Sequence, residues 1–201
     1  MGQDIGRVGI ERVEGWGMSV GSTARIVRPR DLDQLRGALE EARRAGVSLA
    51  PRGTGCSYGD ASTTRDGWAL DMTRMNRLLD FDASTGDAEL EGGASIRQLW
   101  RKALPLGYWP KVVSGTMFPT MGGAAAMNIH GKNNFKVGTF GDNLLEIDLL
   151  LGNGDLVTCS REQNAELFHG AIGGFGMLGI ITRAKTRTTK VYSGDVRVRG
   201  I

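Results

Sequence analysis

Residues 51–60 of the chain read PRGTGCSYGD, a polar, glycine-rich stretch that directly follows a short strand-like segment at 47–50. Gly53 and Gly55 can adopt left-handed or extended-mirror backbone, which turns successive N–H groups toward one point. Three side chains add hydrogen-bond donors around that point: Arg52, Ser57 and Tyr58. The stretch predicts a binding site for a diphosphate, and an ordinary surface loop with an incidental arginine is the alternative.

Glycine is over-represented along the whole chain, with 31 glycines in 201 residues, about twice the usual share of ~7%. The glycines gather in four clusters, at 53–59, 115–123, 138–141 and 170–179. Clustered glycine in a core-forming sequence indicates backbone that turns tightly or approaches a ligand closely. A chain that simply contains many turns is the alternative.

The overall composition is that of a globular protein, with 40% hydrophobic and 23% charged residues. The net charge of +3 comes from 25 basic and 22 acidic residues, a balance that disfavours a nucleic-acid-binding protein. The basic run at 183–190 alternates with Ala and Thr, which predicts the solvent face of a strand.

The two cysteines, Cys56 and Cys159, show neither metal-ligand spacing nor a disulfide framework, so we expect no metal site. The N-terminal residues lack the apolar stretch of a signal peptide, and no segment approaches the ~18 apolar residues of a membrane span. These features predict a cytoplasmic protein and leave contact with a membrane surface open.

Hydrophobic periodicity predicts an α+β fold. In the first half it places strands at 24–28, 47–50, 68–72 and twice within 77–91, and helices at 32–45 (between the Asp31 cap and Gly46) and 95–104. In the second half it places strands at 144–151, 156–159 and 179–189 and a helix at 163–172, with a hairpin turn at 152–155. We expect an N-terminal extension (1–14) and two lobes (15–106 and 107–201), with a chain that continues beyond Ile201.

Two nucleotide-binding motifs are rejected on their context. Residues 174–179, GFGMLG, match the GxGxxG fingerprint, but a helix pattern precedes them and a β-branched run follows, the reverse of a Rossmann unit. The stretch around His130 and Lys132 lacks the upstream glycine and the Ser/Thr of a Walker A motif.

Taken together, the motifs resemble FAD-linked oxidases of the vanillyl-alcohol oxidase (PCMH-type) superfamily. The resemblance covers roughly residues 15–190. It rests on GWG at 15–17, RGTGCSYGD at 52–60, SGT at 114–116, TMGG at 120–123, MNIHGKN at 127–133, FGD at 140–142, AELF at 165–168, GGFG at 173–176 and GII at 179–181. Within the superfamily, HGKN together with RGxGxSYGD is most similar to decaprenylphosphoryl-β-D-ribose, sugar-lactone and alditol oxidases.

The resemblance implies FAD bound in an elongated pose between two α+β lobes, with a separate substrate domain following in sequence. The residues implied to contact FAD are Pro51, Arg52, Gly53, Thr54, Gly55, Cys56, Ser57, Tyr58, Gly59, Asp60, Gly115, Thr116, Thr120, Met121, Gly122, Gly123, Met127, Asn128, Ile129, His130 and Ile181. His130 and Lys132 are implied to stand near the flavin ring, on the side where the substrate arrives, and are the candidate catalytic residues. A buried structural histidine is the alternative for His130, and His169 is expected only to pack or cap.

Many members of the superfamily attach FAD covalently through a histidine at the position that Cys56 occupies here. A thiolate could bond to flavin, but a small buried cysteine is commoner, so we expect noncovalent FAD.

The leading hypothesis for function is an FAD-dependent oxidoreductase that oxidises a sugar-type alcohol, with the sugar or polyol bound through the following domain. The alternative is a non-catalytic FAD-binding module that passes electrons within a multi-subunit oxidoreductase. A nucleotide- or nucleic-acid-binding protein without flavin is a third class, weakened by the balanced charge.

Overall fold

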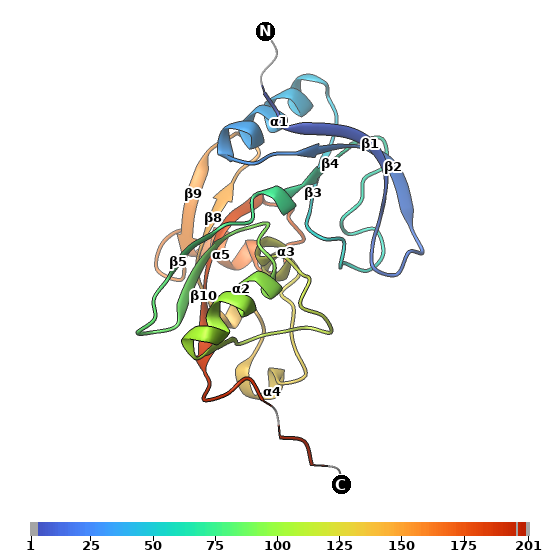
Figure 1. Ribbon diagram of the computed structural model, residues 1–201. Helices are drawn as coiled ribbons and strands as arrows, with labels where there is room; N and C mark the ends of the chain where they lie inside the picture. The colour runs from blue at the N-terminus through green and yellow to red at the C-terminus, as the bar shows by residue number, and fades with distance from the viewer. Residues whose placement is uncertain (1–3, 196, 200–201) are drawn as a thin grey trace.

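The strands of the chain separate into two sheets in the computed structural model, which describes residues 4–195 and 197–199. A four-stranded sheet with α1 forms the upper end of the molecule in Figure 1, and a larger sheet with the remaining helices forms the lower part. This is the α+β arrangement that the sequence predicted.

The first lobe is built from the N-terminal third of the chain. Its elements are β1 (Arg7–Glu14), β2 (Gly21–Arg28), α1 (Leu32–Arg44), β3 (Leu49–Arg52) and β4 (Trp68–Asp71). The strand order is β1-β2-β4-β3, with β1 antiparallel to β2 and the other pairs parallel. Because β3 lies parallel to β4, the connecting residues 53–67 must run back along the sheet. This connection includes most of the glycine-rich loop that is predicted to bind a diphosphate.

Helix α1 begins and ends where the sequence predicted. The Asp31 side chain accepts a hydrogen bond from the Gln34 backbone N–H at 2.9 Å, which satisfies one of the free donors of the first turn. Gly46, just beyond the helix, has a φ of +65°, a conformation that glycine adopts without steric cost. Leu35, Ala38 and Ala42 are buried against the sheet.

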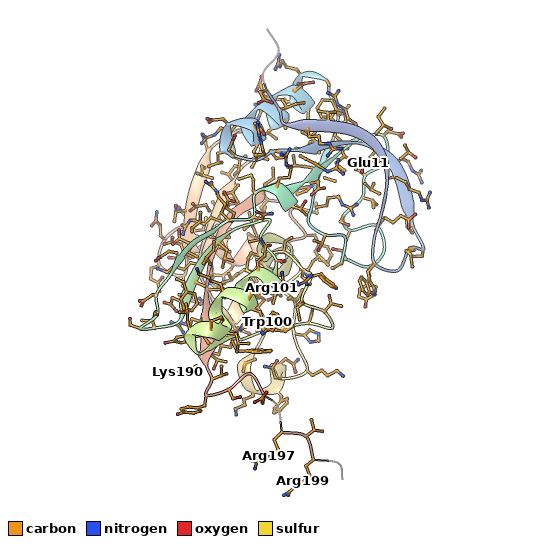
Figure 2. The ribbon with its side chains drawn as sticks, in the orientation of Figure 1. Glu11, Trp100, Arg101, Lys190, Arg197 and Arg199 are labelled. Atoms are coloured by element: carbon orange, nitrogen blue, oxygen red, sulfur yellow. The ribbon has the colours of Figure 1, made fainter. Side chains whose placement is uncertain are left out.

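An arginine connects three strands of this sheet. Arg28 on β2 donates to Glu11 on β1 at 2.8 Å and to Asp71 at the end of β4 at 2.9 Å; Glu11 is labelled in Figure 2. The hydrogen bond to Glu11, which is the largest contribution, raises the pKa of Arg28.

The second lobe contains the other elements: β5 (Leu78–Phe81), β6 (Asp87–Glu91), α2 (Ile96–Ala103), β7 (Tyr108–Pro110), α3 (Met121–Ala126), α4 (Asn134–Val137), β8 (Leu144–Leu150), β9 (Leu156–Ser160), α5 (Ala165–Ala171) and β10 (Ile180–Lys190). Short 3₁₀ turns lie at Met72–Arg74, Leu104–Leu106 and Gly141–Asn143. The sheet order is β5-β6-β10-β8-β9, and β7 pairs with the end of β10. Helix α3 contacts β10, and α2, which carries Trp100 (labelled in Figure 2), packs on β7. The Trp100 and Trp109 rings meet edge-on, with their centroids 6.1 Å apart.

The division between the sheets differs from the division predicted near 105–115. β5 and β6 belong to the second sheet, so the boundary falls between Asp71 and Leu78. The segment expected to be an N-terminal extension instead contributes β1, an edge strand paired along its whole length with β2. The first difference arises because β6 pairs with β10, about ninety residues further along the chain, and the second because residues 7–14 pair with β2 in a hairpin.

The two lobes share apolar packing. Leu150 on β8 and Ile180 on β10 belong to the buried cluster formed by α1, Val27 and Leu70 of the first lobe. Two adjacent glycines after β6 allow this close approach, because a Cβ at Gly92 would overlap the Ile181 carbonyl and one at Gly93 the Met72 carbonyl. The lobes therefore meet along the N-terminal end of β10, beside the glycine-rich loops.

The basic run at 183–190 lies on β10, with its side chains alternating as predicted. Arg183 is not a solvated charge, however, since it pairs with Glu89 at 3.1 Å, with Asp148 at 2.7 Å and with Glu146. These three acids come from the strands on either side of β10. Arg183 thus links β6, β10 and β8 across the sheet.

Candidate functional site

Two glycine-rich segments face each other across the boundary between the lobes. The Thr54 hydroxyl of the first lobe donates to the Phe118 carbonyl of the second at 2.8 Å. Gly53 lies directly against Thr120, because a Cβ at this position would overlap the Thr120 Oγ1. Gly55 has a φ of +74°, whereas Gly53 does not have a positive φ. Gly53 is therefore required for close approach, and Gly55 for its backbone conformation.

A cleft runs between these segments and consists of two adjoining cavities. The large chamber has a volume of about 620 Å³ and is lined by residues 53–58 and 114–116, by Thr120 and by 127–130. The narrow chamber continues from it between Pro51 and Arg52 on one side and Gly122, Gly176 and Ile181 on the other. The chambers share eight lining residues: Gly53, Ser57, Ala61, Ser62, Thr120, Gly123, Met127 and Phe175. Such an elongated cleft suits a long ligand rather than a compact one.

The first-lobe side of the cleft presents unsatisfied hydrogen-bond donors. Within residues 4–195, the backbone N–H groups of 54–62 make no hydrogen bond to another protein group. Arg52 Nη1 and Ser62 Oγ, both on the narrow chamber, are buried without a partner. Buried donors of this kind are costly unless a ligand satisfies them.

The charge of Arg52 is held in a partly desolvated position. Burial, the largest cause, lowers the pKa of its guanidinium, and the nearby Arg28 charge lowers it further, against the opposing effect of Asp71. Its Nη2 donates to the Glu14 carbonyl at 3.1 Å, which fixes the side chain. A positioned guanidinium with a free Nη1 beside unpaired N–H groups is well suited to bind a phosphate.

The second-lobe side offers close backbone but few free donors. Helix α3 begins at its Thr120 N-cap, and the amides of Met121, Gly122 and Gly123 already donate to Ala94 O, Gly92 O and Thr120 Oγ1 respectively. A Cβ at Gly115 would meet no protein atom within 4 Å, so this glycine leaves open space in the large chamber. These residues provide a surface for a flat or extended group to lie against.

The HGKN stretch forms the far wall of the large chamber. Asn128 has a φ of +43°, and its Oδ1 accepts from the Gly141 N–H at 2.9 Å, which holds this turn in place. Gly131 passes beside the 111–115 segment, because a Cβ there would lie 2.5 Å from the Val113 carbonyl. His130 is exposed and lines both the large chamber and a third cavity of about 540 Å³, the side chamber.

Lys132 lines the side chamber only, together with Lys111, Trp109 and Asn133. It therefore lies two residues beyond His130, which marks the boundary between the two chambers. His169, expected only to pack or cap, lies exposed near the end of α5 with its ring edge-on to Phe168 at 5.5 Å.

Most of the residues predicted to contact the cofactor come together around the cleft. The predicted residues that line the two chambers are Pro51, Arg52, Gly53, Thr54, Gly55, Cys56, Ser57, Tyr58, Gly115, Thr116, Thr120, Gly122, Gly123, Met127, Asn128, Ile129, His130 and Ile181. Gly59 and Asp60 lie outside the lining, on the exposed part of the loop. Met121 is fully buried in the second core, because the first turn of α3 points it toward the sheet.

Several lining residues were not predicted. They are Trp16, Ala61, Ser62, Met72, Gly92, Ser114, Pro119, Ala126, Phe175, Gly176, Gly179 and Ile180. Half of them lie within motifs already visible in the sequence: Trp16 in GWG, Ser114 in SGT, Phe175 and Gly176 in GGFG, and Gly179 and Ile180 in GII. The context argument against a Rossmann motif at 174–179 is confirmed, since this stretch follows α5 and precedes β10.

The fold and the cleft define a flavin-binding domain. The family described as "FAD binding domain" matches residues 23–160, more than half of the chain. The chain therefore belongs to this family of PCMH-type FAD-binding domains, and its cofactor is FAD.

Among its relatives, the chain is 34% identical over 194 residues to decaprenylphosphoryl-β-D-ribose oxidase of Mycolicibacterium smegmatis, covering 92% of this chain and 42% of that protein. It is 31% identical to cytokinin dehydrogenase 3 of Oryza sativa subsp. japonica, covering 78% of this chain and 31% of that protein. The structure of 6-hydroxy-D-nicotine oxidase from Arthrobacter nicotinovorans shares the fold, with a TM-score of 0.75 at 23% identity, covering 83% of this chain and 36% of that one. The chain thus spans less than half the length of these proteins.

The residues of the cleft fit FAD. Unpaired donors around Arg52 and Ser62 match a diphosphate, and the open space at Gly115 matches a flat ring. No helix among the described residues is long and apolar enough to cross a membrane.

Proposed function

We propose that the protein oxidises a sugar-type alcohol, with noncovalently bound FAD as hydride acceptor. The observation that carries the proposal is the position of His130, which lines both the large chamber and the side chamber. A substrate in the side chamber would meet a flavin in the large chamber at this residue. When bound, FAD supplies an acceptor for a hydride from the substrate carbon.

The residues of this chain would bind and orient both partners. The 54–62 loop and Arg52 would hold the diphosphate, and the 114–123 segment would lie along the ribityl chain and the ring. His130 is placed to hydrogen-bond a substrate hydroxyl or to take its proton, the role in which histidine is commonest. Lys132 and Lys111 would add positive charge where negative charge develops during the transfer.

Two observations support a sugar-type alcohol as the substrate. The relative that matches over 92% of this chain is named as an oxidase of a ribose derivative. The side chamber is lined by groups that hydrogen-bond to hydroxyl groups, namely Ser114, His130, Lys132 and Asn133. The cytoplasmic location expected from the sequence remains part of the proposal, and the two free cysteines agree with a reducing compartment.

The surroundings of Cys56 give indirect support for noncovalent binding of FAD. Its side chain is half-buried in the wall of the large chamber, with Sγ 3.4 Å from Thr54 Oγ1. This hydrogen-bond partner is a hydroxyl group, not one of the basic side chains that activate cysteine as a nucleophile.

The test is anaerobic mixing of the FAD-loaded, full-length protein with a panel of pentoses, polyols and sugar lactols. Loss of the visible flavin absorbance with a sugar-type alcohol, and formation of the carbonyl product, would support the proposal. Flavin that is reduced only by a partner protein would favour the electron-transfer module instead. A protein that binds no FAD would contradict both.

A further inference from the structure

We infer that Phe175 is a cofactor-positioning residue that closes the cleft over the middle of bound FAD. The inference rests on the proposed binding of FAD in the two chambers and adds a residue that was not among those implied to contact the cofactor. Phe175 is one of the eight residues that line both chambers, so it lies where the narrow and large chambers meet.

The backbone of Phe175 is held in an unfavourable conformation. Its φ is +55°, in the left-handed region that phenylalanine rarely adopts. Two other left-handed residues are asparagines, at 128 and 164, a residue type that tolerates this region and can compensate by local hydrogen bonding. Phenylalanine has no such compensation, and unfavourable backbone of this kind concentrates at functional sites.

The surrounding backbone imposes this conformation. The Phe175 N–H donates to the Ala126 carbonyl at 2.9 Å, and the Gly173 N–H donates to the Ala125 carbonyl at 3.0 Å, so the loop is fixed to the last turn of α3. On the other side, a Cβ at Gly176 would lie 3.7 Å from Pro51 Cγ of the first lobe. The loop therefore bridges the second lobe to the edge of the diphosphate loop.

The Phe175 side chain is poorly buried within the protein, so its packing does little to offset the unfavourable backbone conformation. Phe175 remains 57% exposed, although it stands in a cleft lined by other residues. Neither packing nor hydrogen bonding by its side chain offsets the cost of its backbone. A ligand in the cleft would cover this ring, and an aromatic ring gains much when it is buried against a flat or apolar group.

The test compares three single variants in the full-length protein. Phe175→Gly removes the ring and is compatible with the positive φ; Phe175→Tyr retains the ring; Met18→Gly is the matched control. Met18 also has a positive φ, +50°, and is 74% exposed, but it does not line either chamber. The readouts are the dissociation rate of bound FAD, followed by recovery of flavin fluorescence, and the melting temperature of the apoprotein.

We expect Phe175→Gly to release FAD about 10-fold faster or more, because the ring no longer covers the cofactor. The same change should raise the apoprotein melting temperature by ~2–4 °C, because glycine adopts the positive φ without strain. Met18→Gly should raise the melting temperature similarly and leave FAD release unchanged, and Phe175→Tyr should behave like the wild type. The dissociation rate is measured per bound FAD, so partial unfolding does not disguise the result.

An unchanged release rate in Phe175→Gly would overturn the inference, and so would equal acceleration in Met18→Gly. Failure of the wild-type protein to bind FAD would contradict the proposed function itself, which is a separate outcome.

Discussion

Substituting alanine for Gly55 should weaken FAD binding much more than the same change at Gly59, four residues along the same loop. Both glycines have positive φ, +74° and +60°, so each alanine costs about 1–2 kcal/mol of stability through its backbone. Their surroundings differ. A Cβ at Gly55 would lie 2.6 Å from Arg52 Nη2 and 3.2 Å from the Glu14 carbonyl, whereas one at Gly59 meets nothing within 4 Å.

The methyl group at Gly55 would thus displace Arg52 from its hydrogen bond to Glu14, which holds the guanidinium at the narrow chamber. Losing one hydrogen bond to a charged group costs about 1.5–3 kcal/mol, or a weakening of FAD binding by about 10- to 100-fold. Gly59→Ala should bind FAD within about 2-fold of the wild type.

Isothermal titration of the apoprotein with FAD gives the affinities, and thermal melting of the same samples gives the stabilities. A large difference in affinity would confirm the reasoning, and Gly55→Ala should also melt at a lower temperature than Gly59→Ala because it loses the Arg52–Glu14 hydrogen bond. Equal affinities would refute it, because backbone strain alone would then account for both variants.

Three further predictions follow from the site and the sheet. Cys56→Ala should retain most of its FAD, and acid precipitation of the wild type should leave the flavin in the supernatant; flavin that remains with the denatured wild-type protein would show a covalent bond. His130→Ala and Lys132→Ala should slow flavin reduction by ~10²–10³ in stopped-flow traces normalised to bound FAD, and a purely structural His130 would instead lower stability and FAD content at an unchanged rate. Burial raises the pKa of Asp148, but hydrogen bonds from Arg183 and a threonine outweigh burial and leave it below its usual value. This carboxylate therefore stabilises the fold above the unfolded pKa of about 3.9 and loses its effect as the pH falls below it, so melting temperatures should drop more between about pH 5 and pH 3 in the wild type than in Asp148→Asn.

The sequence predicts local structure correctly where a segment contains its own cap or turn residues. The cap at Asp31 and the glycine at 46 delimit α1, and GNGD at 152–155 forms the predicted turn between β8 and β9. The 107–143 stretch has little periodicity because its two helices are only six and four residues long, and the first of them is held by its Thr120 cap and by the carbonyls of Gly92 and Ala94. The sequence therefore does not predict its secondary structure, although most of its residues that are predicted to contact the cofactor line the cleft.

The chain's own residues were enough to predict the α+β class and most of the residues that line the cleft, because glycines, caps and donors act over a few neighbouring positions. Folding in three dimensions assigned β5 and β6 to the second sheet, paired β1 with β2 and buried Met121 in the core. It also placed His130 between two chambers and Phe175 over the junction of the cleft. These features depend on contacts between segments up to about a hundred residues apart, and such contacts leave no periodic trace in either segment.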